Sequence, residues 1–214
     1  MFRMIVLTQW KWTRAMVLLA TLAGFGIPLA SLQSASETGG HRAFVGTMQS
    51  YGVAYALLAA GVGLVVALAA WAHDQRGRHI YALTLPVSRA RYVLMRLGAG
   101  ALFLAAPVLA VLLGSLVVTA FAAIPAGLHA YPVALTLRFA LAALVAYVVF
   151  FAIGYSTQRT AGIILGALAA LLLTQYVFAL VGVSYNLLGK VADILFTSPG
   201  LLSVFSGRWT LVDA

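Results

Sequence analysis

The sequence predicts an all-α, polytopic helical membrane protein with five spans, and three observations support that fold class. Hydrophobic residues make up 64% of the 214 residues, against about 45 to 50% in an average soluble domain. Charged residues make up only 8%, too few to cover a globule of this size in water, which excludes the soluble, disordered and coiled-coil classes. The apolar stretches are rich in Ala, Leu, Val and Gly without the alternation of barrel strands, so lipid requires them to be helices.

The predicted spans are five stretches that are long enough to cross a hydrocarbon core of about 30 Å and that carry no charge except Arg138, near the start of the fourth. They cover residues 15–33, 50–72, 97–123, 137–156 and 160–183. Residues 1–14 are predicted to form an interfacial helix before the first span, with Arg3, Lys11 and Arg14 on one side of the helical wheel. A cleaved signal is the alternative for the first span, but its apolar run exceeds the about 7 to 15 residues of a signal core, which favours a retained span.

The prolines within the spans and the C-terminal stretch lead to two further predictions. Pro28 and Pro107 lie inside spans, where they are expected to kink a helix rather than end it. Residues 184–214 hold only short apolar runs and cannot span. They are expected to form an extracytoplasmic segment with one or two interfacial helices, anchored by Tyr185, Phe196 and Trp209.

The basic residues are distributed unequally between the two sides of this topology. One side carries nine cations, Arg3, Lys11, Arg14, Arg76, Arg78, Arg89, Arg91, Arg96 and Arg159. The other carries four, Arg42, Arg138, Lys190 and Arg208. The positive-inside rule therefore predicts a cytoplasmic N-terminus and a cytoplasmic loop after the second span. The net charge of +9 then reflects topology, and nucleic acid is not an expected partner.

Chemistry within this chain is not expected. The chain has no cysteine, and its four histidines lack metal-ligand spacing with carboxylates, so no metal site is predicted. No ionisable residue is clearly at mid-membrane, which disfavours a proton relay, an intramembrane protease and an ion-driven transporter. The only Gly-Lys pair, Gly189-Lys190, has Ser184 where a phosphate loop requires its first glycine. The chain is therefore predicted not to be an enzyme.

The loop at residues 74–90, between the second and third spans, holds the most informative pattern. Ile80, Leu83 and Val87 recur at helical spacing, which predicts a short helix with one apolar stripe. Asp74 can cap the start of this helix, and Pro86 ends it. Ser88 can then cap the next helix, which runs through Arg89 and Arg96 into the third span. An ordinary basic loop at anionic lipid head groups is the alternative interpretation.

The spacing of this loop resembles that of permease subunits of ABC-2 type (type V exporter-like) ABC transporters. Gly77 to Pro86 is nine residues, Pro86 to Arg89 three, and Arg89 to Arg96 seven, as in that family. The chain departs from the family pattern at four positions, with Asp74 for Glu, Arg78 for Thr, Met95 for Gly and Arg96 for Lys.

The resemblance implies that residues 75–85 are a coupling helix, which docks into a groove on a separate ATPase. Its implied contact residues are Asp74, Arg76, His79, Leu83 and Arg89. ATP and Mg would be bound by that partner, and this chain would hold no cofactor. The resemblance also implies a bacterial inner (plasma) membrane location and a homodimer or a pairing with a similar permease. Family members have six spans, so the resemblance favours truncation of a six-span protein over a natural five-span variant.

Residues in and near the predicted spans are weaker candidates. Gly162, Gly166 and Ala170 form a small-xxx-small pattern, for which dimer packing and packing within the monomer are equally favoured. The resemblance places a substrate path beside Gln33, Thr174 and Gln175. The sequence therefore favours an exporter permease coupled to ATP hydrolysis, with membrane lipid as a further partner. A non-transporting membrane anchor or scaffold for a cytoplasmic protein is the alternative, and the substrate is undetermined.

Overall fold

The computed structural model describes residues 2–36, 41–76, 88–121, 124, 127–155, 162–163, 166–167, 169–171, 173–174, 187–197, 200, 202–206 and 209–213. The chain divides into two compact units, Met1–Phe151 with Arg208–Ala214, and Ala152–Gly207.

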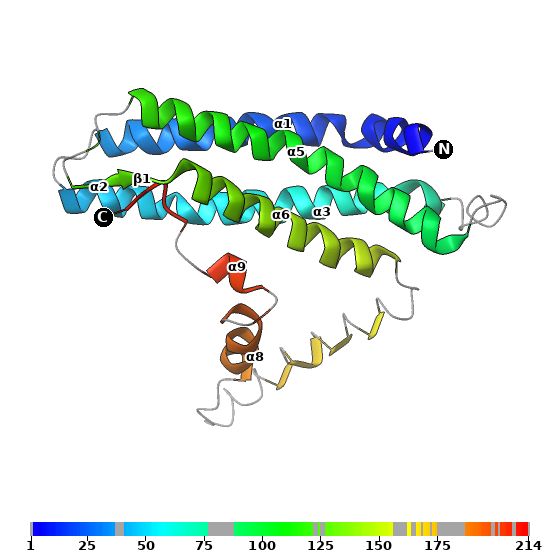
Figure 1. The fold of residues 1–214 in the computed structure, drawn as a ribbon. Helices are drawn as coiled ribbons and strands as arrows, with labels where there is room; N and C mark the ends of the chain where they lie inside the picture. Colours follow the sequence, from blue (N-terminus) through cyan, green and yellow to red (C-terminus); the bar gives the residue numbers. More distant parts are fainter. Residues whose placement is uncertain are drawn as a thin grey trace. The chain divides into compact units, whose positions relative to one another are not determined.

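The first unit is a bundle of long helices. They are α1 (Phe2–Ser36), α2 (His41–Ser50), α3 (Gly52–Arg76), α5 (Arg89–Phe121) and α6 (Pro132–Tyr155), as Figure 1 shows. Among the described residues, four helical stretches are long and apolar enough to cross a membrane, Phe2–Ser34, Phe44–Trp71, Ala90–Phe121 and Pro132–Tyr155. The prediction of a multi-pass helical membrane protein is thereby confirmed.

The helix boundaries differ in part from the predicted spans. α1 runs without a break through residues 14 and 15, the boundary between the predicted interfacial helix and the predicted first span. No glycine or proline precedes Gly24, so nothing in the sequence ends the helix there. Pro28 and Pro107 lie within α1 and α5 and end neither helix. The predicted fifth span, 160–183, lies mostly outside the described residues, with short helical pieces at 162–163, 166–167, 169–171 and 173–174.

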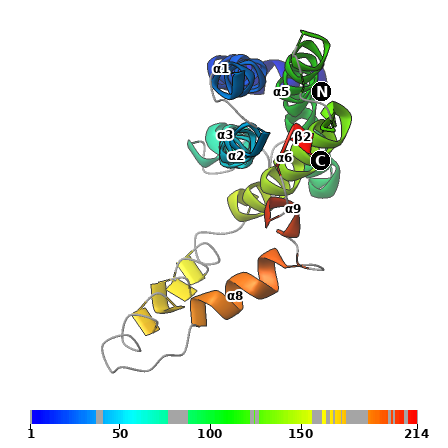
Figure 2. The same cartoon turned by 90° about the vertical axis from the view of Figure 1, so that its left-hand side faces the viewer.

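Glycines lie at two close contacts between helices, where they let the backbones approach. A Cβ added at Gly114 of α5 would lie 2.7 Å from the carbonyl oxygen of Phe25 in α1. Trp10 of α1 stacks near Phe103 of α5 with ring centroids 5.7 Å apart. Since both residue numbers rise together, α1 and α5 run in the same direction, and Figure 2 shows these helices as neighbours.

α3 and α6 also run in the same direction, because contacts recur in the same order along both helices. A Cβ at Gly63 would lie 2.7 Å from the Cβ of Ala146 and 2.7 Å from the backbone nitrogen of Tyr147. Further along both helices, Trp71 and Phe151 have ring centroids 4.9 Å apart. The buried side chains of these helices merge with those of α1 and α5 into one apolar core.

Within the first unit, the C-terminal segment is joined to the helices by a short two-stranded ladder. Strand β1 (His129–Ala130), in the connection between α5 and α6, pairs antiparallel with β2 (Val212–Asp213). The ladder satisfies backbone groups that would otherwise need water. It also fixes the C-terminal strand at the end of the bundle opposite to the α3–α5 connection (Figure 1).

This arrangement corrects the prediction for Trp209. The side chain is buried, with the Arg138 guanidinium 5.3 Å from its ring centroid. A Cβ at Gly52 would lie 3.0 Å from the Trp209 Cβ. The predicted interfacial anchor is therefore wrong for Trp209, because β2 pairing draws it onto the helix bundle.

The second unit contains α8 (Leu187–Phe196) and α9 (Ser203–Ser206). Leu202 donates its backbone N–H to the carbonyl of Leu195 at 2.9 Å, and so links the two helices. Phe196 is partly exposed at the end of α8, and Tyr185 lies outside the described residues.

Candidate functional site

The residues predicted to contact an ATPase flank the α3–α5 connection. Asp74 and Arg76 belong to the last turn of α3, and Arg89 begins α5. His79 and Leu83 lie outside the described residues, together with most of the predicted coupling helix at 75–85. Ser88 is exposed, and its backbone carbonyl accepts a hydrogen bond from the Tyr92 backbone N–H at 3.1 Å. A helix therefore begins directly after Ser88, as its spacing predicts.

Arg96 connects α5 to α3 just inside this connection. Its side chain is buried to 5% exposure, and Nη1 donates a hydrogen bond to the Ala70 carbonyl. The guanidinium carbon lies 5.4 Å from the Trp71 ring centroid and 5.0 Å from that of Tyr92. Arg96 therefore contacts both helices that enter the loop.

The surroundings of Arg96 offset the cost of burying its charge. Insertion scales place the cost of an arginine at the centre of a membrane helix at about 2.5–3.5 kcal/mol. A hydrogen bond to a charged group contributes about 1.5–3 kcal/mol, and a cation–π contact about 0.5–2 kcal/mol. Together, one such hydrogen bond and two cation–π contacts contribute a free energy similar to the cost of burial. A charged Arg96 is therefore compatible with this position.

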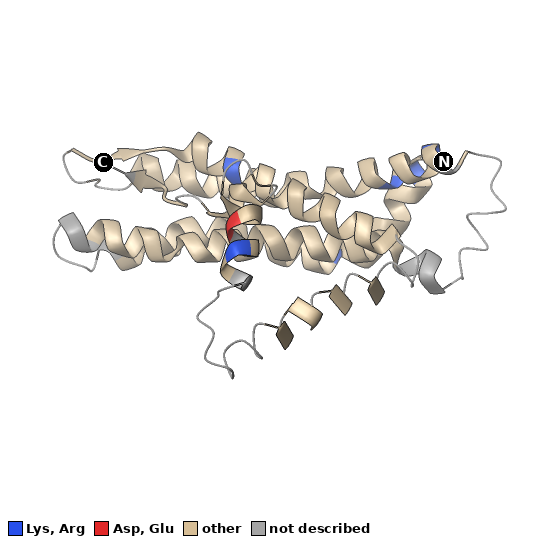
Figure 3. Ribbon diagram, turned by 90° about the horizontal axis from the view of Figure 1, so that it is seen from below, with Lys and Arg blue, Asp and Glu red and all other residues tan. Residues whose placement is uncertain are grey.

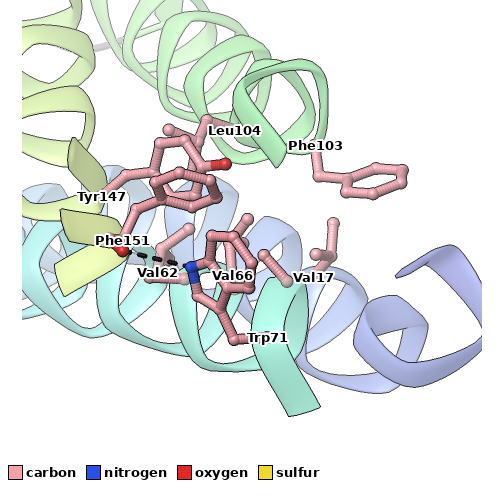
Figure 4. Packing of buried hydrophobic residues seen from close by; sticks show 11 residues of the cluster. Val17, Val62, Val66, Trp71, Phe103, Leu104, Tyr147 and Phe151 are labelled. Carbon is pink, nitrogen blue, oxygen red and sulfur yellow. Dashed lines mark hydrogen bonds between the residues drawn. The ribbon is translucent and has the colours of Figure 1, made fainter. Parts of the chain in front are cut away.

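Two further hydrogen bonds connect α6 to the same place. The Tyr147 hydroxyl of α6 donates to the Leu97 carbonyl of α5 at 3.0 Å. The Trp71 indole nitrogen of α3 donates to the Phe151 carbonyl of α6 at 3.1 Å, the dashed line in Figure 4. With the Arg96 bond, each pair among α3, α5 and α6 is joined by one side chain that donates to a backbone carbonyl. We refer to Trp71, Arg96 and Tyr147 as the three-helix clamp.

The sequence predicts only part of the clamp. Arg96 was singled out by its distance from Arg89, but its burial and its partners were not predicted. The Tyr92–Arg96 pair at i and i+4 is the local signal, since residues at this spacing share a helix face. Trp71 and Tyr147 carry no such signal, because they reach Arg96 only through helix packing.

Exposed cations surround this end of the first unit. Arg3, Lys11 and Arg14 of α1 are exposed, as is Arg91 of α5. Figure 3 shows the basic positions of α1 gathered toward the N-terminus. α1 contains no Asp or Glu, so this part of the surface has a positive charge.

The other candidate residues are not assembled into a site. Gln33 is an exposed residue of α1, and Thr174 is exposed in the second unit, where its hydroxyl donates to the Ala170 carbonyl at 2.8 Å. A Cβ at Gly162 or Gly166 would meet nothing within 4 Å. Gln175 lies outside the described residues. Gly162 and Gly166 thus have no close neighbour among the described residues.

The first unit also has an apolar groove of about 300 Å³ between α1 and α3. All its lining residues are apolar, among them Met16, Ala20, Ala23, Gly61 and Val65. Such a surface suits hydrocarbon and offers no group for acid–base chemistry. Among the described residues no three His, Asp or Glu side chains are grouped to hold a metal ion.

Fold and sequence together define the class: the chain is a multi-pass helical membrane protein. No protein-family model, curated protein or solved structure matches the chain.

Proposed function

We propose that the chain is the membrane-spanning permease subunit of an ATP-driven ABC-2 exporter in a bacterial inner membrane. The observation that carries the proposal is the spacing of Gly77, Pro86, Arg89 and Arg96 in the loop between two spans. The position of that loop supports it. The loop joins α3 to α5 at the end where the clamp connects both helices to α6.

In this proposal, ATP and Mg are bound by a separate ATPase subunit. The chain has no phosphate loop of its own. The rim of the loop is basic, with Arg76, Arg78 and Arg89, and would suit an acidic groove on the partner. Nucleotide shifts the ATPase between two states, and the loop would pass that change to the spans.

We also propose that the chain crosses the membrane a fifth time, between Tyr155 and Trp209. The β1–β2 ladder holds the C-terminal strand at the start of α6. Phe151 lies 19 residues beyond Pro132, which is about 29 Å of helix and close to the hydrocarbon thickness. A chain that leaves α6 at one face and returns at the other must cross once more. The excess of cations at the N-terminal end favours the cytoplasm for that side.

The resemblance to ABC-2 permeases implies two permease halves around a path, so we propose a homodimer or a pair with a similar chain. Gly162, Gly166 and Ala170 are the candidate contact residues, because small side chains allow close helix approach in lipid. Gln33, Thr174 and Gln175 are the candidates for the substrate path.

The proposal is tested by reversing two charges of the loop. In the double variant Arg76→Glu and Arg89→Glu, we expect copurification of an ABC ATPase with this chain to fall by about tenfold or more, since each close charge pair contributes to docking. The measurement is the ATPase-to-permease ratio after affinity purification from membranes.

The matched control is the double variant Arg3→Glu and Arg91→Glu, which makes the same charge change at exposed positions. It is expected to retain the ATPase. Equal retention by both double variants would contradict the docking loop. A partner that is retained but hydrolyses no ATP would instead favour a membrane scaffold.

A further inference from the structure

The three-helix clamp has a geometric consequence for α6. The loop is covalently continuous with α3 and α5, whereas α6 follows only after the whole length of α5 and the β1 connection. A displacement of the loop therefore reaches the near end of α6 through non-covalent contacts. The clamp hydrogen bonds to α6 lie at this end, from Trp71 to Phe151 and from Tyr147 to Leu97.

We propose that Arg96, Trp71 and Tyr147 are positioning residues that make the loop-proximal ends of α3, α5 and α6 move as one body. The inference rests on the proposed function for the source of the force, which is the nucleotide-driven ATPase. The clamp itself rests on the three hydrogen bonds and the aromatic contacts. With it, a push on the loop displaces α6 together with the two helices that hold the loop.

Arg96 has the central part in this assembly for a physical reason. Its guanidinium carries several donors in one plane, and here it contacts α3 at Ala70 while it lies against the rings of Trp71 and Tyr92. The Tyr147 ring packs against Phe151 in a tilted arrangement with centroids 5.6 Å apart, so the α6 side of the clamp is aromatic. Figure 4 shows Trp71, Phe151 and Tyr147 turned toward one another.

α1 is joined to α5 by other contacts. Trp10 meets Phe103, and Phe25 lies against Gly114. None of the three clamp hydrogen bonds involves α1. The clamp therefore predicts concerted displacement of α3, α5 and α6 at this end, whatever α1 does.

The test uses spin labels in the purified complex with its ATPase, in nanodiscs of phosphatidylethanolamine and phosphatidylglycerol. The chain has no native cysteine, so Ser88→Cys labels the loop edge alone and Val148→Cys labels α6 alone. Both positions are exposed. In the otherwise unaltered chain, ATP with vanadate is expected to change the spectra of both labels.

In the Arg96→Met background, the response at Ser88 is expected to persist while the response at Val148 is lost. Arg91→Met is the matched control, since it removes an exposed arginine from the same helix, and it should keep both responses. Tyr147→Phe and Trp71→Phe each remove one donor and keep the aromatic packing, so they are expected to weaken the Val148 response in a folded protein. An unchanged Val148 response in Arg96→Met and in both aromatic variants would overturn the clamp.

The exporter proposal can fail separately. If nucleotide does not change the Ser88 spectrum in the unaltered complex, the proposed function is wrong. The clamp is then tested on the purified permease without its ATPase. Arg96→Met, but not Arg91→Met, is expected to increase the mobility of the Val148 label. Equal mobility in the two variants would overturn the inference.

Discussion

Replacing Gly63 with alanine is expected to destabilise the protein by about 1–3 kcal/mol, the usual cost of adding a group to a filled interface. The added Cβ would lie 2.7 Å from the Tyr147 backbone nitrogen and 2.9 Å from the Ala143 carbonyl oxygen. Backbone atoms cannot move aside as a flexible side chain can, so α3 and α6 must separate. The measurement is thermal unfolding in detergent, followed by tryptophan fluorescence and by the monodisperse fraction that survives heating.

Gly61→Ala is the control for this experiment. Gly61 lies two residues earlier on α3, and a Cβ there would meet nothing within 4 Å. This substitution is expected to leave stability unchanged or slightly raised, because alanine favours the helix. Similar unfolding curves for the two variants would show that α3 and α6 are not in close contact at Gly63.

The second large effect concerns the proposed topology. The test places single cysteines in the cysteine-free chain at Ser88, His129, Tyr155 and Thr210. Each cysteine is expected to react with a reagent from one side of the membrane only. A membrane-impermeant maleimide added to spheroplasts should label positions 129 and 210 but not 88 and 155. The reason is that a polar backbone crosses lipid only as a helix, so each span changes the side.

Permeabilised cells provide the control, since all four cysteines should then react. Labelling of positions 155 and 210 from the same side would rule out the fifth crossing. Labelling of 88 and 155 from outside, with 129 and 210 protected, would keep five crossings and reverse the orientation that the basic residues predict.

The first four spans were predictable because their signal is local. Every backbone hydrogen bond of a membrane helix lies within the segment, so apolar length and flanking charge are sufficient. The start of α5 after Ser88 was predictable for a similar reason, because helix starts depend on nearby residues. The predicted interfacial helix, residues 1–14, and the predicted first span are parts of one continuous helix, α1.

The candidate site was predictable only as a position along the chain. The spacing within the loop identified four candidate residues, Asp74, Arg76, Arg89 and Arg96. It did not indicate that Arg96 is buried, because the partners Ala70 and Trp71 are about 26 residues distant, a separation that no helical period connects. Tyr147 is 50 residues from the carbonyl to which it donates.

By itself, the sequence determined that this protein is a multi-pass helical membrane protein, where its first four spans lie, and which loop carries the spacing of Gly77, Pro86, Arg89 and Arg96. The tertiary structure alone decided that Trp71, Arg96 and Tyr147 join three helix ends, that Gly63 is a point of close backbone contact, and that β2 returns Trp209 to the bundle. The physical reason is the range of the interactions. Hydrophobicity and helix hydrogen bonds act within about one turn or one span, whereas the clamp, the glycine contact and the strand ladder exist only after separate helices have packed.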